Sequence, residues 1–281
     1  MNILILGRGK GSWEMRGQQL GAAMKARVTS SPSDADWHWA ERVVFVKRAD
    51  PVWMARAKAL GLPVVWDALD FWAQPTENSL SEATARDRLR LNQDRIQPVL
   101  TIGATQAMAE AARGFYLPHH GRRGVQPTLT REHVKVVGYD GNGMYLERWG
   151  LALQQACRKR GWVFVINPID LSQVDILVAL RGGQWDGWIC REWKSGVKLV
   201  NAILAGRPII TQATAAQREL RPAGSVVADL ADLPDALDRW ASLGAREAVI
   251  IESLHRTSEL SLSSIADRYQ RVLMQAEAVT C

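Results

Sequence analysis

Short apolar runs alternate with longer amphipathic stretches along most of the chain. The runs are apolar at every position, as expected for parallel strands that are covered on both faces. They predict ten strands, at residues 2–6, 43–47, 63–66, 99–102, 115–117, 134–138, 163–167, 176–180, 208–211 and 225–228. The amphipathic stretches predict helices at 13–25, 52–60, 77–94, 145–160, 197–205, 233–243 and 263–278. Strands and helices in alternation predict an α/β protein with parallel sheets.

Glycine and proline mark several of the predicted boundaries. Gly61 follows a predicted helix and Pro63 opens the next strand, and Gly206 and Pro208 repeat this arrangement. The segment 118–131 holds two prolines and few apolar residues, and fresh alternation begins after it. We therefore expect two Rossmann-like halves, at residues 1–128 and 129–262, followed by a terminal helix within 263–281.

The composition is ordinary for a globular protein, with 47% hydrophobic and 23% charged residues. This excludes disorder, collagen-like repeats and a coiled coil as the main architecture. No apolar window approaches the roughly 18 residues of a membrane helix, and the start of the chain reads as a strand rather than a signal peptide. Three widely spaced cysteines and five histidines form no ligand motif, so we expect no metal site and a cytoplasmic location.

The net charge is +6 and most of the excess lies in the first half. Residues 1–128 hold 17 Lys and Arg against 12 Asp and Glu, and residues 129–281 hold 18 against 17. The excess favours an anionic partner such as nucleic acid or a phosphorylated glycan, although a basic surface kept for solubility gives the same balance.

The segment 181–201, RGGQWDGWICREWKSGVKLVN, is the strongest candidate site. It follows a predicted strand, and ligands of open parallel sheets bind beyond the carboxyl ends of strands. Ser195 is a candidate N-cap, and the start of the following helix offers amides and a positive dipole end to a phosphate. The cations that could converge there on a diphosphate are Arg181, Arg191, Lys194 and Lys198.

The run KSGVKLVNAILAGRPIIT resembles the donor-binding segment of GT-B glycosyltransferases of the family 4 type, K-S-x-x-K-x-x-E-A followed by G-x-P-V-V. The resemblance implies that Lys194, Ser195 and Lys198 hold the diphosphate of a nucleotide sugar. Asn201 stands where the family has a glutamate that binds the ribose, and Glu219 is a second candidate for a ribose or sugar contact.

The resemblance continues in the order of weaker motifs. DRIQPVLTIGATQAMAEAA is similar to the last strand and helix of the family's N-terminal domain, and VVGYDG is similar to the opening of its C-terminal domain. The terminal helix matches the helix that crosses back to the N-terminal domain in this fold. The resemblance thus implies GT-B architecture, with two Rossmann-like domains facing across a cleft, and a metal-independent enzyme without a cofactor.

Acidic residues follow the third of the longer N-terminal strands, in VVWDALDFWAQP. Asp67 or Asp70 could act as general base for an acceptor hydroxyl, with a pKa raised by burial beside tryptophans. The alternative is that either residue caps the following loop or helix.

Gly7–Gly17, GRGKGSWEMRG, is a glycine-rich turn after the first strand, but it does not have the spacing of a dinucleotide-binding loop. In the GT-B arrangement this turn faces the cleft, where Arg8, Gly9, Lys10 and Arg16 would contact the acceptor or a phosphate. The alternative is a tight strand-to-helix turn. His119 and His120 lie in the proline- and glycine-rich connection, where a hinge residue contacting the cleft is favoured over a catalyst.

These features predict a glycosyltransferase that moves a sugar from a nucleotide-diphosphate donor, expected to be a UDP-sugar, to an acceptor hydroxyl. Two acceptors stay open, namely a 5-hydroxymethylpyrimidine in double-stranded DNA, as for phage-type DNA glycosyltransferases, and a bacterial surface glycan. The N-terminal charge and the series Arg86, Arg88, Arg90 and Arg95 favour DNA. Two alternatives from other classes are a nucleotide-sugar 2-epimerase and a non-catalytic nucleic-acid-binding protein.

Overall fold

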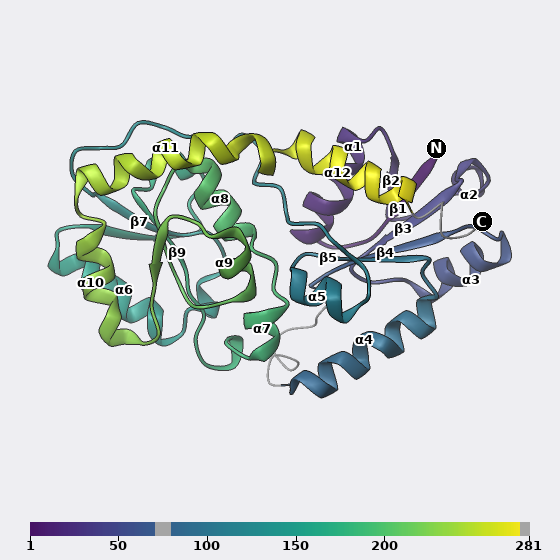
Figure 1. Cartoon of the computed structure of the whole chain (residues 1–281), viewed down its shortest axis with the longest axis horizontal. Coiled ribbons are helices and arrows are strands. Elements are labelled where there is room, and N and C mark those ends of the chain that lie inside the picture. Colours follow the sequence, from purple (N-terminus) through teal and green to yellow (C-terminus); the bar gives the residue numbers. More distant parts are fainter. Residues whose placement is uncertain (71–79, 276–281) are drawn as a thin grey trace.

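The computed structural model describes residues 1–70 and 80–275. The described residues form two parallel β-sheets side by side, one of six strands and one of five (Figure 1). The first sheet has the order β2-β1-β3-β4-β5-β6 and the second the order β11-β10-β9-β7-β8. The α/β architecture predicted from the sequence is therefore confirmed.

The strands of the first sheet are β1 (Ile3–Leu6), β2 (Arg27–Thr29), β3 (Arg42–Val46), β4 (Val64–Leu69), β5 (Leu100–Gly103) and β6 (Phe115–Tyr116). Those of the second are β7 (Val136–Tyr139), β8 (Val163–Ile166), β9 (Ile176–Ala179), β10 (Ile209–Thr211) and β11 (Gly224–Val226). All ten predicted strands are present, with small shifts of their ends. Strand β2 was not predicted, because its three residues, Arg-Val-Thr, are too few and too polar to stand out as an apolar run.

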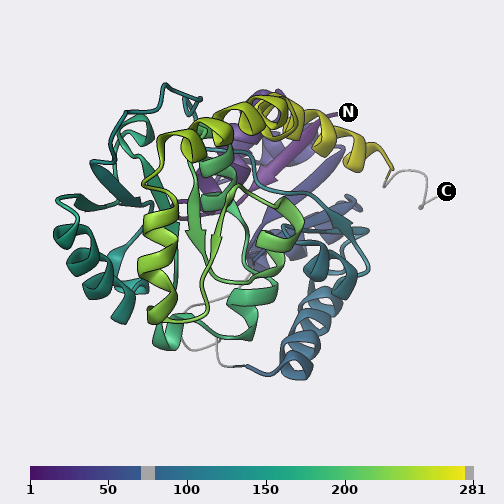
Figure 2. The ribbon, with the colours of Figure 1, turned by 60° about the vertical axis from the view of Figure 1, so that its left-hand side comes forward.

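Helices cover both faces of each sheet (Figures 1 and 2). Around the first sheet they are η1 (Trp13–Gln19, a π-helix), α1 (Leu20–Ala23), α2 (Asp34–Trp39), α3 (Pro51–Ala59), α4 (Glu82–Ile96) and α5 (Gln106–Ala111). Around the second they are α6 (Arg148–Lys159), α7 (Trp188–Glu192), α8 (Val197–Ala205), α9 (Ala215–Leu220) and α10 (Leu233–Arg239). Short 3-10 turns are η2 (Gly143–Tyr145), η3 (Leu171–Gln173), η4 (Gly183–Trp185) and η5 (Leu230–Asp232).

The predicted helix 197–205 matches α8, whereas 145–160 and 233–243 are too long at one or both ends. The predicted helix 77–94 begins at residues that lie outside the described ones, and its described part starts at Glu82 because Ser81 caps it by accepting a hydrogen bond from the Thr84 amide. Helices α2, α7 and α9 were not predicted, because each is six residues or shorter and shows little helical periodicity. Helix α5 lies in the segment that resembles the last strand and helix of the family's N-terminal domain.

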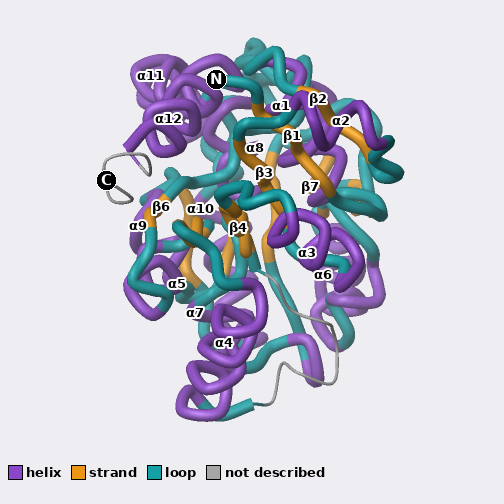
Figure 3. The backbone as a smooth tube through the Cα atoms, turned by 90° about the vertical axis from the view of Figure 1, so that its right-hand side faces the viewer, coloured by secondary structure: helices purple, strands orange, loops and turns teal. Residues whose placement is uncertain are grey.

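The buried strands divide their side chains between two cores, as a sheet covered on both faces must. Along β3, Val43 and Phe45 enter a core shared with α3, α4 and α5, and Val44 and Val46 enter a core on the opposite face. Figure 3 shows this sheet from its own side of the molecule, with helices around the strands.

The last described residues form two helices rather than the one that was predicted. Helix α11 (Leu243–Leu260) packs along α8 beside the second sheet, and α12 (Leu262–Gln275) packs on α1 of the first sheet (Figures 1 and 2). Tyr269 and Leu273 of α12 are fully buried in the core that contains Ile5 and Val44. The last residues of the predicted terminal helix, 276–281, lie outside the described ones. The predicted return of the chain's end to the N-terminal sheet is confirmed.

Candidate active site

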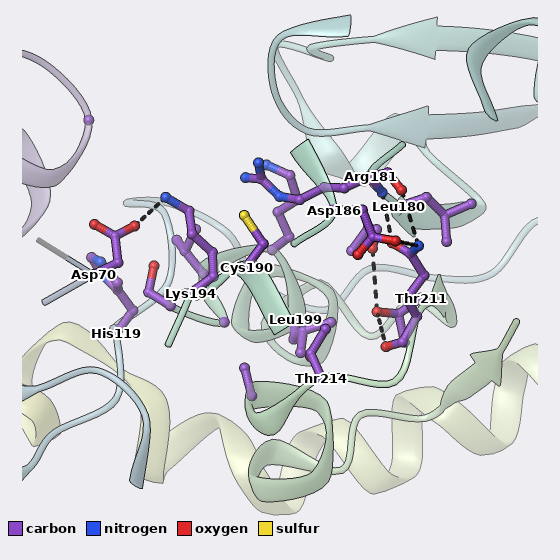
Figure 4. Close-up of a pocket in the computed structure, with 18 of the residues that line it drawn as sticks. Asp70, His119, Leu180, Arg181, Asp186, Cys190, Lys194, Leu199, Thr211 and Thr214 are labelled. Carbon is purple, nitrogen blue, oxygen red and sulfur yellow. Dashed lines mark hydrogen bonds and ion pairs between the residues drawn. The ribbon is translucent and has the colours of Figure 1, made fainter. Parts of the chain in front are cut away.

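A cavity of about 240 Å³ lies between the two sheets, at the carboxyl ends of their strands. The second sheet contributes residues that follow β9 and β10, together with the start of α8. The first sheet contributes the turn before η1, Asp70 after β4 and His119 from the connection between the sheets. Figure 4 shows Asp70 and His119 at one side of this cavity and Arg181, Asp186 and Thr211 at the other.

The first turn of α8 borders the cavity. Its N-cap is Gly196, so the prediction that Ser195 caps this helix is wrong, although Ser195 does line the cavity. A Cβ at residue 196 would come within 2.5 Å of Leu220 Cδ1, so a larger residue there would displace that side chain. Within the described part of the chain no side chain caps the helix, so its first amides remain available to an anion.

Two cations line the cavity beside this helix start, and each lies over an aromatic ring. Lys198 Nζ lies 5.1 Å from the centre of the Tyr139 ring, and the Arg181 guanidinium carbon lies 4.8 Å from that of Tyr145. Burial and then the nearby Arg181 lower the pKa of Lys198 to about 8. Gln212 fixes the loop after β9, because its side chain accepts from the Arg181 amide (2.8 Å) and donates to the Arg181 carbonyl (3.1 Å).

Lys194 reaches across the cavity to the other sheet. Its ammonium forms an ion pair with Asp70 (Figure 4), and Lys47 Nζ lies 2.6 Å from the other carboxylate oxygen of Asp70. Burial opposes ionisation of this carboxyl, but the two ammonium groups outweigh it and hold the pKa of Asp70 well below its usual range. The expectation of a raised pKa is therefore wrong for Asp70.

Asp67 lies elsewhere, in the interior of the first sheet, and does not line the cavity. Its Oδ2 accepts a hydrogen bond from the Tyr269 hydroxyl (2.9 Å) and lies 3.5 Å from Arg16 Nε. Burial raises the pKa of Asp67 against the opposing charge of Arg16. The expected rise thus occurs at the carboxylate that joins β4 to α12 rather than at the one in the cavity.

His119 and His120 have different surroundings. His119 lines the cavity, and burial followed by the charge of Arg16 lowers its pKa well below the usual value. Among the described residues its Nδ1 is buried without a hydrogen-bond partner. His120 is fully buried between the Gly121 carbonyl (2.7 Å from Nδ1) and the Met15 carbonyl (3.0 Å from Nε2), where it joins the connection to η1.

Three predicted donor-binding residues do not line the cavity. Arg191 forms a two-point ion pair with Asp186, at 2.9 and 2.8 Å. The Asn201 side chain is buried, accepting from the Arg122 amide (2.8 Å) and donating to Asp140 (2.7 Å). Glu219 accepts from the amide of Gln106 at the start of α5, a contact between the two halves of the chain.

The side chains of the glycine-rich turn point to two different places, a second cavity and the protein interior. Arg8, Gly9 and Lys10 line a second cavity of about 210 Å³ beside the first one. Arg16, expected to contact the acceptor or a phosphate, is fully buried and donates to the carbonyls of Leu117 (2.6 Å) and Pro118 (3.3 Å). The expectation that Arg16 adds charge to the cleft is wrong, because the side chain points into the protein and fastens the connection between the sheets.

Several residues of the cavity were not predicted. Thr211 ends β10 and Gln212 and Thr214 follow it, whereas Gly11 and Ser12 come from the turn after β1 and Met15 from η1. Their position at or beyond the carboxyl ends of predicted strands is a signal that could have identified them. Within residues 1–70 and 80–275, no group of three or more His, Cys, Asp or Glu side chains is arranged to hold a metal ion, and no helix has the length and apolarity to cross a bilayer.

Comparison with known proteins gives matches at the level of structure only. No protein-family model and no curated sequence matches the chain. The structure is similar to AviGT4, a glycosyltransferase involved in avilamycin A biosynthesis, with a TM-score of 0.56 and 12% identity over 99% of this chain and 98% of that one. It is also similar to the UDP-forming α,α-trehalose-phosphate synthase of Burkholderia vietnamiensis, with a TM-score of 0.54 and 11% identity over 92% and 83% of the two chains.

A third similar structure is that of accessory secretory proteins 1, 2 and 3 of Streptococcus pneumoniae, with a TM-score of 0.51 and 10% identity. The match covers 88% of this chain, which spans only 58% of that one. At these identities the likeness establishes the fold alone. Two parallel-sheet domains, a cavity between their strand ends and a terminal helix that returns to the first domain establish that this chain has the GT-B glycosyltransferase fold.

Proposed function

We propose that the protein is a glycosyltransferase that uses a nucleotide-diphosphate sugar. The observation that carries the proposal is the uncapped start of α8, which borders the cavity between the sheets together with Lys198 and Arg181. Amides at a helix start and two cations form a site for a diphosphate and for the charge that develops on it as it leaves. UDP is the expected nucleotide, which agrees with the UDP-forming synthase among the similar structures.

In the proposed reaction the acceptor oxygen bonds to the anomeric carbon of the sugar. The bond from that carbon to the diphosphate oxygen breaks, and its electron pair leaves with the nucleoside diphosphate. Lys198, Arg181 and the α8 amides stabilise that negative charge. Lys194 lies at the same cavity, and we propose that Asp70 acts by positioning it, since the ammonium groups of Lys47 and Lys194 already pair with its two carboxylate oxygens.

We propose that His119 accepts the proton of the acceptor hydroxyl. It lines the cavity near Asp70, and its low pKa keeps the imidazole neutral at pH 7. A neutral imidazole can take the proton as the new bond forms. Asp67 remains a candidate only through an indirect role, because Arg16 and Tyr269 enclose its carboxylate away from the cavity.

The identity of the acceptor is a separate part of the proposal. Hydroxymethylated DNA would need a continuous basic surface beside the cavity. On α4, Arg86 and Arg90 form ion pairs with Glu82 (2.8 Å) and Asp87 (2.7 Å) of the same helix. These pairs reduce the positive charge that α4 offers to a nucleic acid, and they favour the glycan or small-molecule acceptor over DNA.

The test is an incubation with UDP- and GDP-sugars and two acceptor sets, DNA containing 5-hydroxymethylcytosine or 5-hydroxymethyluracil, and a panel of sugars. Mass spectrometry of digested nucleosides and of the sugars would show a gain of one hexose on the true acceptor. Release of an epimerised donor without any acceptor would favour a 2-epimerase. DNA binding with no affinity for UDP or GDP would contradict the glycosyltransferase proposal and favour a nucleic-acid-binding protein.

A further inference from the structure

A second cavity, of about 210 Å³, lies beside the donor cavity on the first sheet. It is formed by the turn after β1 and by the residues at the end of β3, with buried Trp13 and Val46 among its lining residues. Four cations line it and no acidic residue of the described chain does: Arg8, Lys10, Lys47 and Arg48.

Two of these four cations have an acidic partner. Arg8 lies 3.2 Å from Asp50 and stacks over the Trp53 ring at 4.5 Å, and Lys47 is paired with Asp70. Lys10 and Arg48 are exposed and have no acidic partner within residues 1–70 and 80–275. At least two cations of the cavity thus lack a counter-charge within the described chain, which suits a phosphate monoester at pH 7.

The backbone around this cavity adopts conformations that are unfavourable for residues with a side chain. Lys47 adopts a left-handed conformation (φ 63°), which is unfavourable for a residue with a side chain. Its amide donates to the Asp67 carbonyl (2.7 Å), and its side chain reaches Asp70 at the edge of the donor cavity. Gly9 and Gly11 have positive φ values (101° and 58°), which lets the opposite turn bend around the same space.

The two cavities are linked. Ser12 lines both of them, and Lys47 of the second cavity holds Asp70 of the first. A small molecule with its phosphate at Lys10 and Arg48 would therefore place its remaining atoms toward Ser12 and Asp70, where the proposed transfer takes place.

We propose that the second cavity is an anion subsite for the acceptor, and that the acceptor is a small molecule carrying a phosphate monoester, such as a sugar phosphate. That the bound molecule is an acceptor rests on the proposed function. That the cavity binds an anion rests on its cations alone. A single phosphate suits the cavity better than a polyanion, because α4 offers mainly paired arginines beyond it.

The first experiment measures phosphate binding without relying on glycosyl transfer. Inorganic phosphate is titrated calorimetrically into Lys198→Ala protein, in which the donor cavity has lost one cation, and into the same protein with Lys10→Ala and Arg48→Ala added. We expect the affinity to fall about tenfold or more with the added pair. The matched control adds Arg158→Ala and Lys159→Ala, two exposed residues at the end of α6, and should leave the affinity unchanged. Equal affinity in all three proteins would overturn the subsite.

The second experiment compares a hexose 6-phosphate with the unphosphorylated hexose as acceptors for a UDP-sugar. We expect the phosphorylated sugar to be preferred, and Lys10→Ala/Arg48→Ala to raise its KM about tenfold or more with the KM for the donor unchanged. Equal use of both sugars would overturn the inference while leaving the proposed function intact. Phosphate binding that depends on Lys10 and Arg48, in a protein that fails to bind UDP, would support the anion subsite and contradict the proposed function. Loss of duplex DNA binding in the double variant, without any effect of the hexose phosphate, would overturn the small acceptor.

Discussion

Lys194 of the second sheet forms an ion pair with Asp70 of the first, and the pair crosses the cavity between them. Asp70 is 3% exposed and is also held by Lys47, so one buried carboxylate balances two ammonium groups from different parts of the chain. The contact places Lys194 at the proposed donor cavity and joins the two halves of the protein at that point.

We expect Asp70→Asn to lower the free energy of unfolding by roughly 3 kcal/mol, because it leaves two partly buried lysines without their counter-charge. Denaturant unfolding measures this value. Lys194→Ala should cost less, since Lys47 still balances Asp70. In the double variant the two effects should fall short of their sum by about 1–3 kcal/mol. Additive effects would show that the ion pair contributes nothing to stability.

The affinity for UDP should depend on pH through Lys198, whose pKa of about 8 lies below the usual 10.5. A lowered lysine pKa means that the charge is present below pH 8 and is lost as the pH rises through that value. An anion binds the charged form, so we expect constant affinity from pH 6.5 to 7.5 and a decline of up to about tenfold per pH unit above 8. Calorimetric titrations across this range provide the measurement.

Lys198→Ala is the control for that profile. It should weaken UDP binding at pH 7 and remove the decline above pH 8. A variant that keeps the same pH dependence would assign the titration to another group, such as Lys194.

The sequence predicted the helix start at α8 because Lys, Ser and Gly precede an apolar stretch that ends at Gly206. It also brought Asp70, Lys194 and Lys198 into one site, since residues after parallel strands meet at the same edge. What it could not supply was the direction of each side chain. Arg16 and Lys10 stand in the same turn, yet one is fully buried beneath the connection and the other is exposed at a cavity.

Asp67 and Asp70 illustrate the same limit. They are three residues apart, with Asp67 inside β4 and Asp70 directly after it, whereas the predicted strand ended at residue 66 and left both carboxylates in the following loop. Tyr269 lies more than 200 positions later in the chain, and its hydrogen bond to Asp67 holds that carboxylate in the interior, away from the cavity. Likewise, the roles of Asn201 and Glu219 depend on Arg122 and Gln106, partners that only the packing of the connection and of the two halves brings near.

His119→Ala should reduce kcat by about a hundredfold or more if the imidazole accepts the acceptor's proton, since a positioned base contributes that much. Binding of UDP should change little, because the diphosphate site is made by α8, Lys198 and Arg181. The matched control is His133→Ala, at an exposed histidine whose side chain is 82% accessible. Equal loss of kcat and of UDP affinity in His119→Ala would indicate a structural role for this histidine.

The return of α12 to the first sheet provides the last prediction. The Tyr269 hydroxyl donates to Asp67 Oδ2 at 2.9 Å, and both side chains are fully buried. Tyr269→Phe keeps the ring in its core and removes one donor from a carboxylate that water does not reach. We expect the free energy of unfolding to fall by about 1–3 kcal/mol, the cost of a buried acceptor that loses its partner.

Thermal and denaturant unfolding would measure this effect against Tyr145→Phe, the same change at a half-buried ring that stacks on Arg181. That control should lie within about 0.5 kcal/mol of the parent protein. A smaller loss in Tyr269→Phe at pH 4 than at pH 7 would follow from the raised pKa of Asp67, because a protonated carboxyl no longer needs the hydroxyl as a donor. Equal stability of Tyr269→Phe and Tyr145→Phe at both pH values would show that apolar packing alone holds α12 on the first sheet.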